Sequence, residues 1–147
     1  ASFERIKKAG ADVVLDYSSN SLASDIVDAN DGALIDMTIE VEFGVNIATV
    51  TEVMKPNGRV AIYGSALDMA PSLPFGPILF KALTLDVILI YIQTEEDRSR
   101  MIDKLNEAFG DGALTIPVQE IFDLKESARA HQAVEAGARK GAILIKP

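Results

Sequence analysis

The side chains that most often perform acid–base or nucleophilic chemistry are scarce in this sequence. His131 is the only histidine, and there is no cysteine. His131 falls in the middle of a predicted helix, with no serine or cysteine nucleophile in a recognisable setting. A packing or surface role is therefore favoured over that of a catalytic base, which needs a partner within hydrogen-bond reach. We assign no catalytic residue from the sequence.

Clustered carboxylates are the second candidate for chemistry. None of the clusters has the spacing of a calcium-binding loop, and one coincides with a predicted helix start. Without cysteine and with one histidine, the ligands that transition metals prefer are nearly absent. The sequence predicts no metal site. The clusters are Asp25, Asp28 and Asp31; Glu40 and Glu42; and Glu95, Glu96 and Asp97.

Glycine-rich turns that bind phosphate are missing as well. Neither G-x-G-x-x-G nor G-x-x-x-x-G-K-[ST] occurs, and most glycines fall at predicted helix ends or turns. The tripeptide Tyr63-Gly64-Ser65 differs, because it follows a predicted strand, where a glycine lets a flat ligand approach the backbone. The same pattern is common in ordinary turns, so the signal is weak by itself.

Alternating strands and helices must position these candidates. The pattern favours a parallel sheet with helices on both faces, and ligands bind such sheets at the carboxyl ends of the strands. Residues 83–91 are predicted to form the longest and most apolar strand. The predicted strands are 12–17, 33–38, 59–63, 83–91, 116–121 and 141–145, and the predicted helices are 2–9, 21–29, 43–54, 94–109 and 124–136.

Composition limits the classes of partner. The formal net charge is −8 and the pI about 4.6, and an acidic surface repels nucleic-acid phosphates. No run of 18 apolar residues occurs, so no membrane span is predicted. The lack of cysteine is compatible with an intracellular location, and we expect a cytoplasmic protein. The sequence starts as if inside a domain, which suggests a fragment of a longer chain.

Four segments, in order, resemble the medium-chain dehydrogenase/reductase superfamily. Residues 8–17 resemble "K-x-G-A-D-x-V-x-x-Y", and residues 36–41 resemble the strand along the adenosine side of the dinucleotide. Residues 54–64 (Met54-Lys55-Pro56-Asn57-Gly58-Arg59-Val60-Ala61-Ile62-Tyr63-Gly64) resemble "L-x-P-G-G-R-x-V-x-x-G". The tail, 130–145, resembles "A-H-x-x-x-E-x-G-x-x-x-G-K-V-V-L", with Ala142 in place of the usual lysine. Residues 40–46 and 73–75 resemble the zinc-free quinone oxidoreductase branch.

The resemblance implies an α/β fold in two parts. Residues 1–112 would form a partial Rossmann-like domain that lacks its first two strands and glycine-rich turn. Residues 113–147 would form the C-terminal part of a GroES-like catalytic domain. In the family's strand order, 3-2-1-4-5-6, the strand predicted at 12–17 is separated from the next three by the missing pair, which leaves its packing open.

The resemblance also implies a cofactor site. Carried over by position, one group of residues would surround the adenosine ribose and its 2′-phosphate: Ser2, Arg5 and Tyr17. Val41 would pack near the adenosine. A last group would border the nicotinamide: Tyr63, Gly64, Ser65, Ile88 and Ile90. Arg5 and Tyr17 favour NADPH, with NADH as the alternative.

The implied parent protein is an NADPH-dependent oxidoreductase that transfers hydride to a quinone or an activated carbonyl or alkene. The alternatives are a zinc-dependent alcohol dehydrogenase of the same superfamily and a non-catalytic fragment or assembly module. The chain by itself is expected to be inactive. In this superfamily the strand equivalent to 83–91 pairs with its two-fold mate, so a homodimer through that strand is expected.

Overall fold

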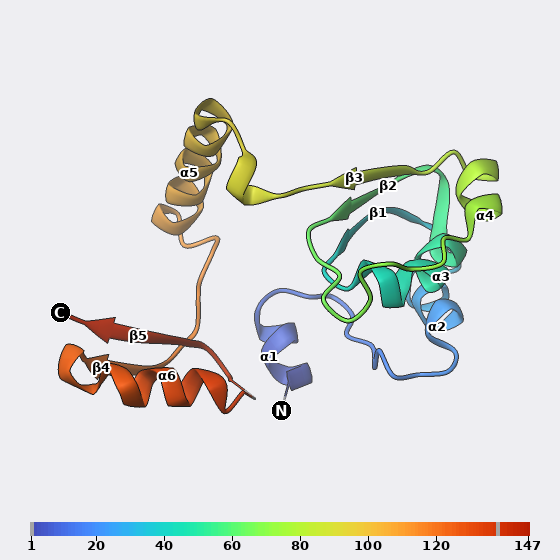
Figure 1. Cartoon of the computed structure of the whole chain (residues 1–147). Helices are drawn as coiled ribbons and strands as arrows, with labels where there is room; N and C mark the ends of the chain where they lie inside the picture. Colours follow the sequence, from blue (N-terminus) through green and yellow to red (C-terminus); the bar gives the residue numbers. More distant parts are fainter. Residues whose placement is uncertain (1, 138) are drawn as a thin grey trace. The chain divides into compact units, whose positions relative to one another are not determined.

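The structure is a computed structural model that describes residues 2–137 and 139–147, apart from the side chain of Ser2. It divides into two compact units. Unit 1 comprises Ala1–Ala11 and Thr94–Pro147, and unit 2 comprises Asp12–Gln93. Figure 1 shows the elements of both units along the chain. The sequence boundary proposed at 112/113 stays a prediction.

Unit 2 is built on a three-stranded parallel sheet in the order β1-β2-β3. The strands are β1 (Ile35–Glu40), β2 (Met54–Ile62) and β3 (Thr84–Val87). Thr38 of β1 lies opposite Val60 of β2, which lies opposite Leu85 of β3. The parallel arrangement predicted from the alternation of elements is confirmed, and it brings the carboxyl ends of all three strands to one edge.

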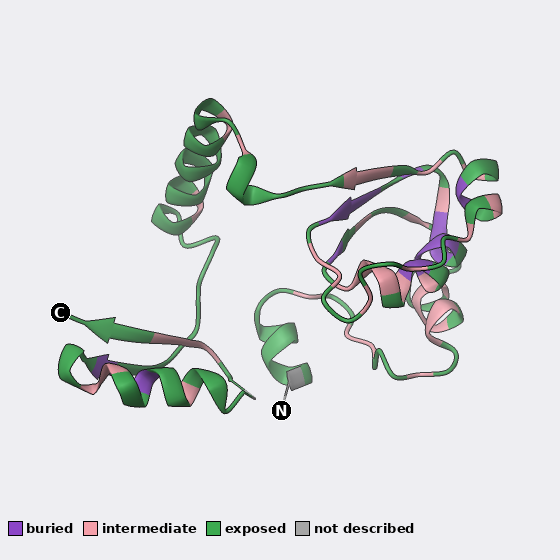
Figure 2. Ribbon diagram, viewed as in Figure 1, coloured by how far each residue is buried: buried purple, intermediate pink, exposed green. Residues whose placement is uncertain are grey.

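Helices α3 (Phe43–Val53) and α4 (Phe75–Phe80) cover the sheet face that carries Val60 and Ile62. Helix α2 (Leu22–Ala29) packs against α3. Ile47 and Val50 of α3 and Ile78 of α4 form one buried cluster with Met54, Val60 and Ile62. Figure 2 shows that the buried residues of this unit gather on α3, β1 and β2. The helix predicted at 43–54 is confirmed as α3. Phe43, Ile47, Val50 and Met54, spaced four, three and four residues apart, all belong to this cluster or pack against it.

A lysine closes the C-terminal end of α3. Lys81, just after α4, donates from Nζ to the carbonyl oxygens of Thr51 (2.7 Å), Glu52 (2.9 Å) and Met54 (2.8 Å). Its own carbonyl accepts from the backbone N–H of Asn57 at 2.7 Å. A cation at the end of a helix satisfies carbonyls that have no partner within the helix and complements the negative end of its dipole. We call this arrangement the Lys81 clasp.

Three predicted elements of unit 2 are wrong or displaced. Residues 12–17 form no strand, because no strand among the described residues lies beside them to complete a ladder. The strand predicted at 83–91 is only β3, and η1 (Ile90–Ile92) replaces its end, so the nine-residue β2 is the longest strand. Helix α4 falls between the strands predicted at 59–63 and 83–91, where no helix is predicted.

Unit 1 contains α1 (Ser2–Lys8) and the long helix α5 (Glu95–Gly110). Thr94 caps α5: its Oγ1 accepts from the N–H of Asp97 at 3.1 Å and donates to that carboxylate at 2.7 Å. The Thr94 hydroxyl, and after it Arg100, lowers the pKa of Asp97 below its ordinary value. The helix start predicted from Thr94 and the acids after it is confirmed.

A two-stranded parallel sheet completes unit 1. It pairs β4 (Val118–Asp123) with β5 (Ala142–Lys146), joined by η2 (Leu124–Glu126) and α6 (Ser127–Glu135). Phe122 and Ala130 form its small buried centre. Arg5 of α1 donates from Nη1 to the carbonyl of Arg139 at 3.4 Å. Among the described residues, no helix has the length and apolar character needed to cross a bilayer.

Candidate functional site

The carboxyl ends of β1 and β2 are joined by backbone hydrogen bonds. The N–H of Tyr63 donates to the carbonyl of Glu40 at 3.0 Å, which extends the ladder by one residue. The loop after β1 then turns toward the loop after β2, since the N–H of Phe43 donates to the carbonyl of Gly64 at 3.2 Å and Glu42 forms an antiparallel bridge with Ser65. We call these two segments, 40–44 and 63–68, the paired loops.

Glu40 holds the first of the paired loops from within. Its residue is only 7% exposed, and its Oε1 accepts from the N–H of Glu42 and from Nδ2 of Asn46, both at 2.9 Å. A buried carboxylate is stable only when hydrogen bonds or an opposite charge replace its lost hydration. Glu40 therefore fixes both the peptide that carries Val41 and the first turn of α3.

Two further side chains tie the paired loops together. Ser65 Oγ accepts from the N–H of Gly44 at 2.8 Å and donates to the carbonyl of Asp68. Glu42 Oε2 accepts from the N–H of Leu67 at 3.0 Å. The N–H of Gly44 lies at the start of α3, where helical N–H groups have no partner within the helix, so Ser65 supplies one from a distant loop.

Gly64 is needed because the paired loops approach closely. A Cβ at this position would lie 2.5 Å from the carbonyl oxygen of Val41, a distance that side-chain carbons do not tolerate. The position of Gly64 after a predicted strand is a weak signal that a ligand approaches the backbone there. In the structure it is the backbone of Val41 that takes up this space.

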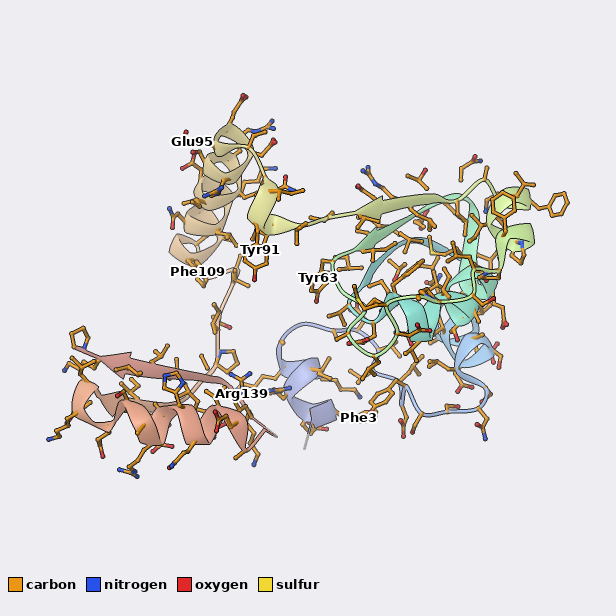
Figure 3. The ribbon with its side chains drawn as sticks, in the orientation of Figure 1. Phe3, Tyr63, Tyr91, Glu95, Phe109 and Arg139 are labelled. Atoms are coloured by element: carbon orange, nitrogen blue, oxygen red, sulfur yellow. The ribbon has the colours of Figure 1, made fainter. Side chains whose placement is uncertain are left out.

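Exposed apolar side chains lie on the paired loops and on the segment that follows β3. The exposed fractions are 50% for Val41, 59% for Tyr63, 40% for Ile88 and 61% for Ile90. Ile88 is anchored at the end of β2, because its N–H donates to the carbonyl of Ile62 at 2.7 Å. Figure 3 shows the side chain of Tyr63 projecting from the end of β2. Exposed apolar groups on a hydrogen-bonded backbone form a surface suited to a flat aromatic ring.

The structure brings some of the predicted site residues together and leaves others apart. Val41, Tyr63, Gly64 and Ser65 belong to the paired loops, and Ile88 and Ile90 follow the neighbouring strand β3. Tyr17 lies in unit 2 but is 89% exposed, and in the described part of the chain no hydrogen bond joins it to the paired loops. Ser2 and Arg5 belong to α1 of unit 1, and the side chain of Ser2 lies outside the described part of the chain.

The turn that carries Tyr17 is held by its neighbours. Ser18 donates to Oδ1 of Asp16 from its hydroxyl at 2.6 Å and from its N–H at 2.9 Å. These hydrogen bonds lower the pKa of Asp16 below its ordinary value, the hydroxyl having the larger effect. The turn therefore places the carboxylate of Asp16 one residue before Tyr17. A 2′-phosphate is bound by cationic groups rather than by carboxylates.

Sequence reasoning missed the residues that hold the site. Glu40 and Glu42 were interpreted only as a weak candidate for metal binding, and Asn46 and Asp68 were not singled out. No strand-end signal marked Glu40, because the strand predicted at 33–38 stops two residues before it, whereas the observed β1 ends at Glu40. The contacts of Asn46 and Asp68 depend on where the paired loops meet, which a local pattern does not specify.

Comparison with known protein families identifies the family to which this chain belongs. The model of the zinc-binding dehydrogenase family matches residues 9–145. Because that match spans most of the chain, the chain belongs to the zinc-binding dehydrogenase family, and the resemblance to the medium-chain dehydrogenase/reductase superfamily is confirmed.

Individual relatives agree with this assignment. A quinone oxidoreductase from Pseudomonas aeruginosa is 24% identical over 144 residues, which cover 96% of this chain and 44% of the relative. A mycobacterial quinone oxidoreductase has a solved structure that matches with a TM-score of 0.80 at 25% identity, covering 96% of this chain and 44% of that one. A 2-haloacrylate reductase matches with a TM-score of 0.82 at 21% identity, covering 96% and 45%. The chain thus spans less than half the length of these relatives.

The family name raises the question of zinc. Among the residues that the structure describes, no three His, Cys, Asp or Glu side chains are grouped so that they could hold a metal ion. A catalytic zinc site needs three protein ligands that converge on an open position. The described residues do not fit a zinc ion, and no step below depends on one.

Proposed function

We propose that the protein containing this chain is an NADPH-dependent oxidoreductase that reduces a quinone or an activated carbonyl or alkene. The observation that supports this most directly is the pair of loops at the carboxyl ends of β1 and β2, rimmed by exposed apolar side chains, in a member of a dehydrogenase family. Parallel sheets of this kind bind nucleotides at that edge. A bound nicotinamide cofactor supplies the hydride.

The chain's own residues would bind and orient. Val41 would pack against the adenosine, and Tyr63, Ile88 and Ile90 would offer apolar surface to the nicotinamide ring. The backbone of Gly64 and Ser65 would set the distance of closest approach, since the hydrogen bonds of the paired loops hold it in place. Hydride transfer is sensitive to such positioning, because the reacting atoms must be held within a few tenths of an ångström.

We expect the full-length gene product to bind NADPH with micromolar affinity. Nicotinamide fluorescence during titration measures this directly, and a parallel titration with NADH gives the preference. Tyr17→Phe is expected to weaken NADPH binding several-fold and to leave NADH binding unchanged, because only NADPH carries the 2′-phosphate that the hydroxyl would meet. Arg5→Gln is expected to act in the same direction.

Tyr91→Phe is the matched control for Tyr17→Phe. In the single chain Tyr91 is as exposed as Tyr17, at 85% against 89%, and it has no assigned contact with the phosphate. It belongs to the segment 83–91 to which a dimer is assigned below, but phenylalanine keeps its apolar ring there. Equal effects of the two substitutions would contradict the role given to Tyr17. A full-length protein that binds neither nucleotide would overturn the proposed function and favour an assembly role for the chain.

A homodimer through residues 83–91 is the second part of the proposal. Within the described residues, β3 pairs on one edge only, with β2, and the residues from Val87 to Ile92 are all at least 40% exposed. An apolar, unpaired strand edge favours pairing with a second copy. Ile88→Asp places a charge in this edge and is expected to shift the full-length protein from dimer to monomer in size-exclusion light scattering. A wild-type protein that is monomeric, or a variant that still dimerises, would argue against this interface.

A further inference from the structure

Glu40 stands out among the acidic residues of the described chain. It is the only one that is buried, and none of the ion pairs in the described residues includes it. Burial without an opposite charge is costly for a carboxylate. A side chain that serves only to fix a loop could do so with a neutral amide, so the charge itself calls for an explanation.

The two oxygens of this carboxylate are in different situations. Oε1 accepts both hydrogen bonds, from Glu42 N–H and Asn46 Nδ2. Oε2 accepts none from the described residues. In that part of the chain no fully buried polar side-chain atom is without a partner, so the described residues leave Oε2 accessible. A carboxylate oxygen can accept two hydrogen bonds, so Oε2 retains its whole capacity.

We propose that Glu40 is a ligand-binding residue, whose Oε2 accepts a hydrogen bond from a ribose hydroxyl of the bound dinucleotide. The inference rests on the proposed function and deepens it. Glu40 ends β1, and its carbonyl is hydrogen-bonded to Tyr63 N–H, so it lies between Val41 and the loop that contains Tyr63, Gly64 and Ser65. Oε2 is thus a free acceptor between Val41, which is assigned to the adenosine, and the loop with Tyr63, which is assigned to the nicotinamide.

The chemistry of the site favours a hydroxyl over other groups. A phosphate would be repelled by an ionised carboxylate. A divalent cation would need several free oxygens, but Oε2 of the neighbouring Glu42 is already engaged with Leu67 N–H. A hydroxyl donates one hydrogen bond to a carboxylate, and acids bind ribose hydroxyls in this way in dinucleotide-binding folds.

The substitution Glu40→Gln tests the role of Oε2 separately from that of Oε1. Its carbonyl oxygen can still accept from Glu42 and Asn46, so the melting temperature is expected to stay close to that of the wild type. The NH₂ group replaces the charged acceptor, and we expect the Kd for NADPH to rise about tenfold, since hydrogen bonds to charged groups are the stronger ones. Fluorescence titration of the full-length wild-type and Glu40→Gln proteins gives the two Kd values for NADPH.

Asn46→Ala is the matched control. It removes a partner of Oε1 and leaves Oε2 unchanged, so it is expected to lower the melting temperature while changing the Kd for NADPH less than threefold. Binding of two fragments of NADPH then shows which of its two riboses provides the hydroxyl. A loss of affinity of Glu40→Gln for adenosine 2′,5′-bisphosphate assigns the adenosine ribose, and a loss for reduced nicotinamide mononucleotide assigns the nicotinamide ribose.

Two results would overturn the inference without touching the proposed function. One is a Glu40→Gln protein that binds NADPH as tightly as the wild type. The other is a wild-type protein that binds NADPH analogues lacking each ribose hydroxyl in turn as tightly as NADPH itself, a measurement that does not depend on the folding of any variant. A wild-type protein that binds no nicotinamide nucleotide at all would instead overturn the proposed function, and this inference with it.

Discussion

Gly44→Ala is expected to destabilise the protein by about 3 kcal/mol, because the added methyl group has no room. The Cβ would lie 2.8 Å from Ser65 Oγ and closer still to the backbone carbonyl of Asp68. A backbone carbonyl cannot rotate away as a flexible side chain can. The loop 65–68 would have to move, and the hydrogen bond from Gly44 N–H to Ser65 Oγ would break with it.

Gly76→Ala is the matched control, since Gly76 is also in a helix of unit 2. A Cβ there meets nothing within 4 Å, and alanine is the better helix former by up to about 1 kcal/mol. We expect Gly76→Ala to leave the melting temperature unchanged or raise it slightly, and Gly44→Ala to lower it by roughly 10 °C or more. Scanning calorimetry of the full-length protein measures both, and a Gly44→Ala protein as stable as the wild type would show that the paired loops are not closely packed.

Lys81→Met is expected to destabilise the protein by about 2 kcal/mol, through the loss of the Lys81 clasp. Methionine preserves much of the apolar stem but leaves the carbonyls of Thr51, Glu52 and Met54 without the ammonium group that they share. Hydrogen bonds to a charged group contribute more than neutral ones, and the cation also loses its favourable place at the end of α3.

Lys55→Met is the control for this substitution. Lys55 pairs with Asp36, and both side chains are well exposed, at 45% and 77%. Exposed ion pairs contribute about 0–1 kcal/mol, so Lys55→Met is expected to have a much smaller effect on the urea midpoint than Lys81→Met. Equal shifts for the two variants would mean that the clasp adds nothing beyond a surface charge.

The elements whose signals are local could be predicted from the sequence. The apolar spacing that begins at Phe43 specifies α3, and Thr94 with three following acids specifies the start of α5. Residues 12–17 also carry a strand pattern, yet they form none, because a strand needs a hydrogen-bonded neighbour that its own sequence does not supply. The end of β3 was mispredicted for a related reason: the apolar run continues, but the ladder with β2 stops at the pair Ile62 and Val87.

The candidate site was predictable in its location but not in its construction. The rule for parallel sheets directs attention to Val41, Tyr63, Gly64 and Ser65, and the structure brings these four together. The hydrogen bonds that hold them involve Asn46 and Asp68, whose partners are separated from them in the sequence and are decided by loop geometry. Glu40 could not be found in this way, because the rest of β1 is exposed or half-buried and the burial of Glu40 depends on α3 and the loop after the strand.

The discontinuity of unit 1 has a consequence for how the protein is made. Unit 2 is one continuous stretch of chain, whereas α1 and residues 94–147 of unit 1 are separated by all of it. On the ribosome, β1, β2 and β3 of unit 2 are all available to pair once β3 has emerged. Helix α1 is synthesised before these strands, but the carbonyl of Arg139 that Arg5 contacts is synthesised after them. The hydrogen bond between Arg5 and Arg139 can therefore form only after all of unit 2 has been made.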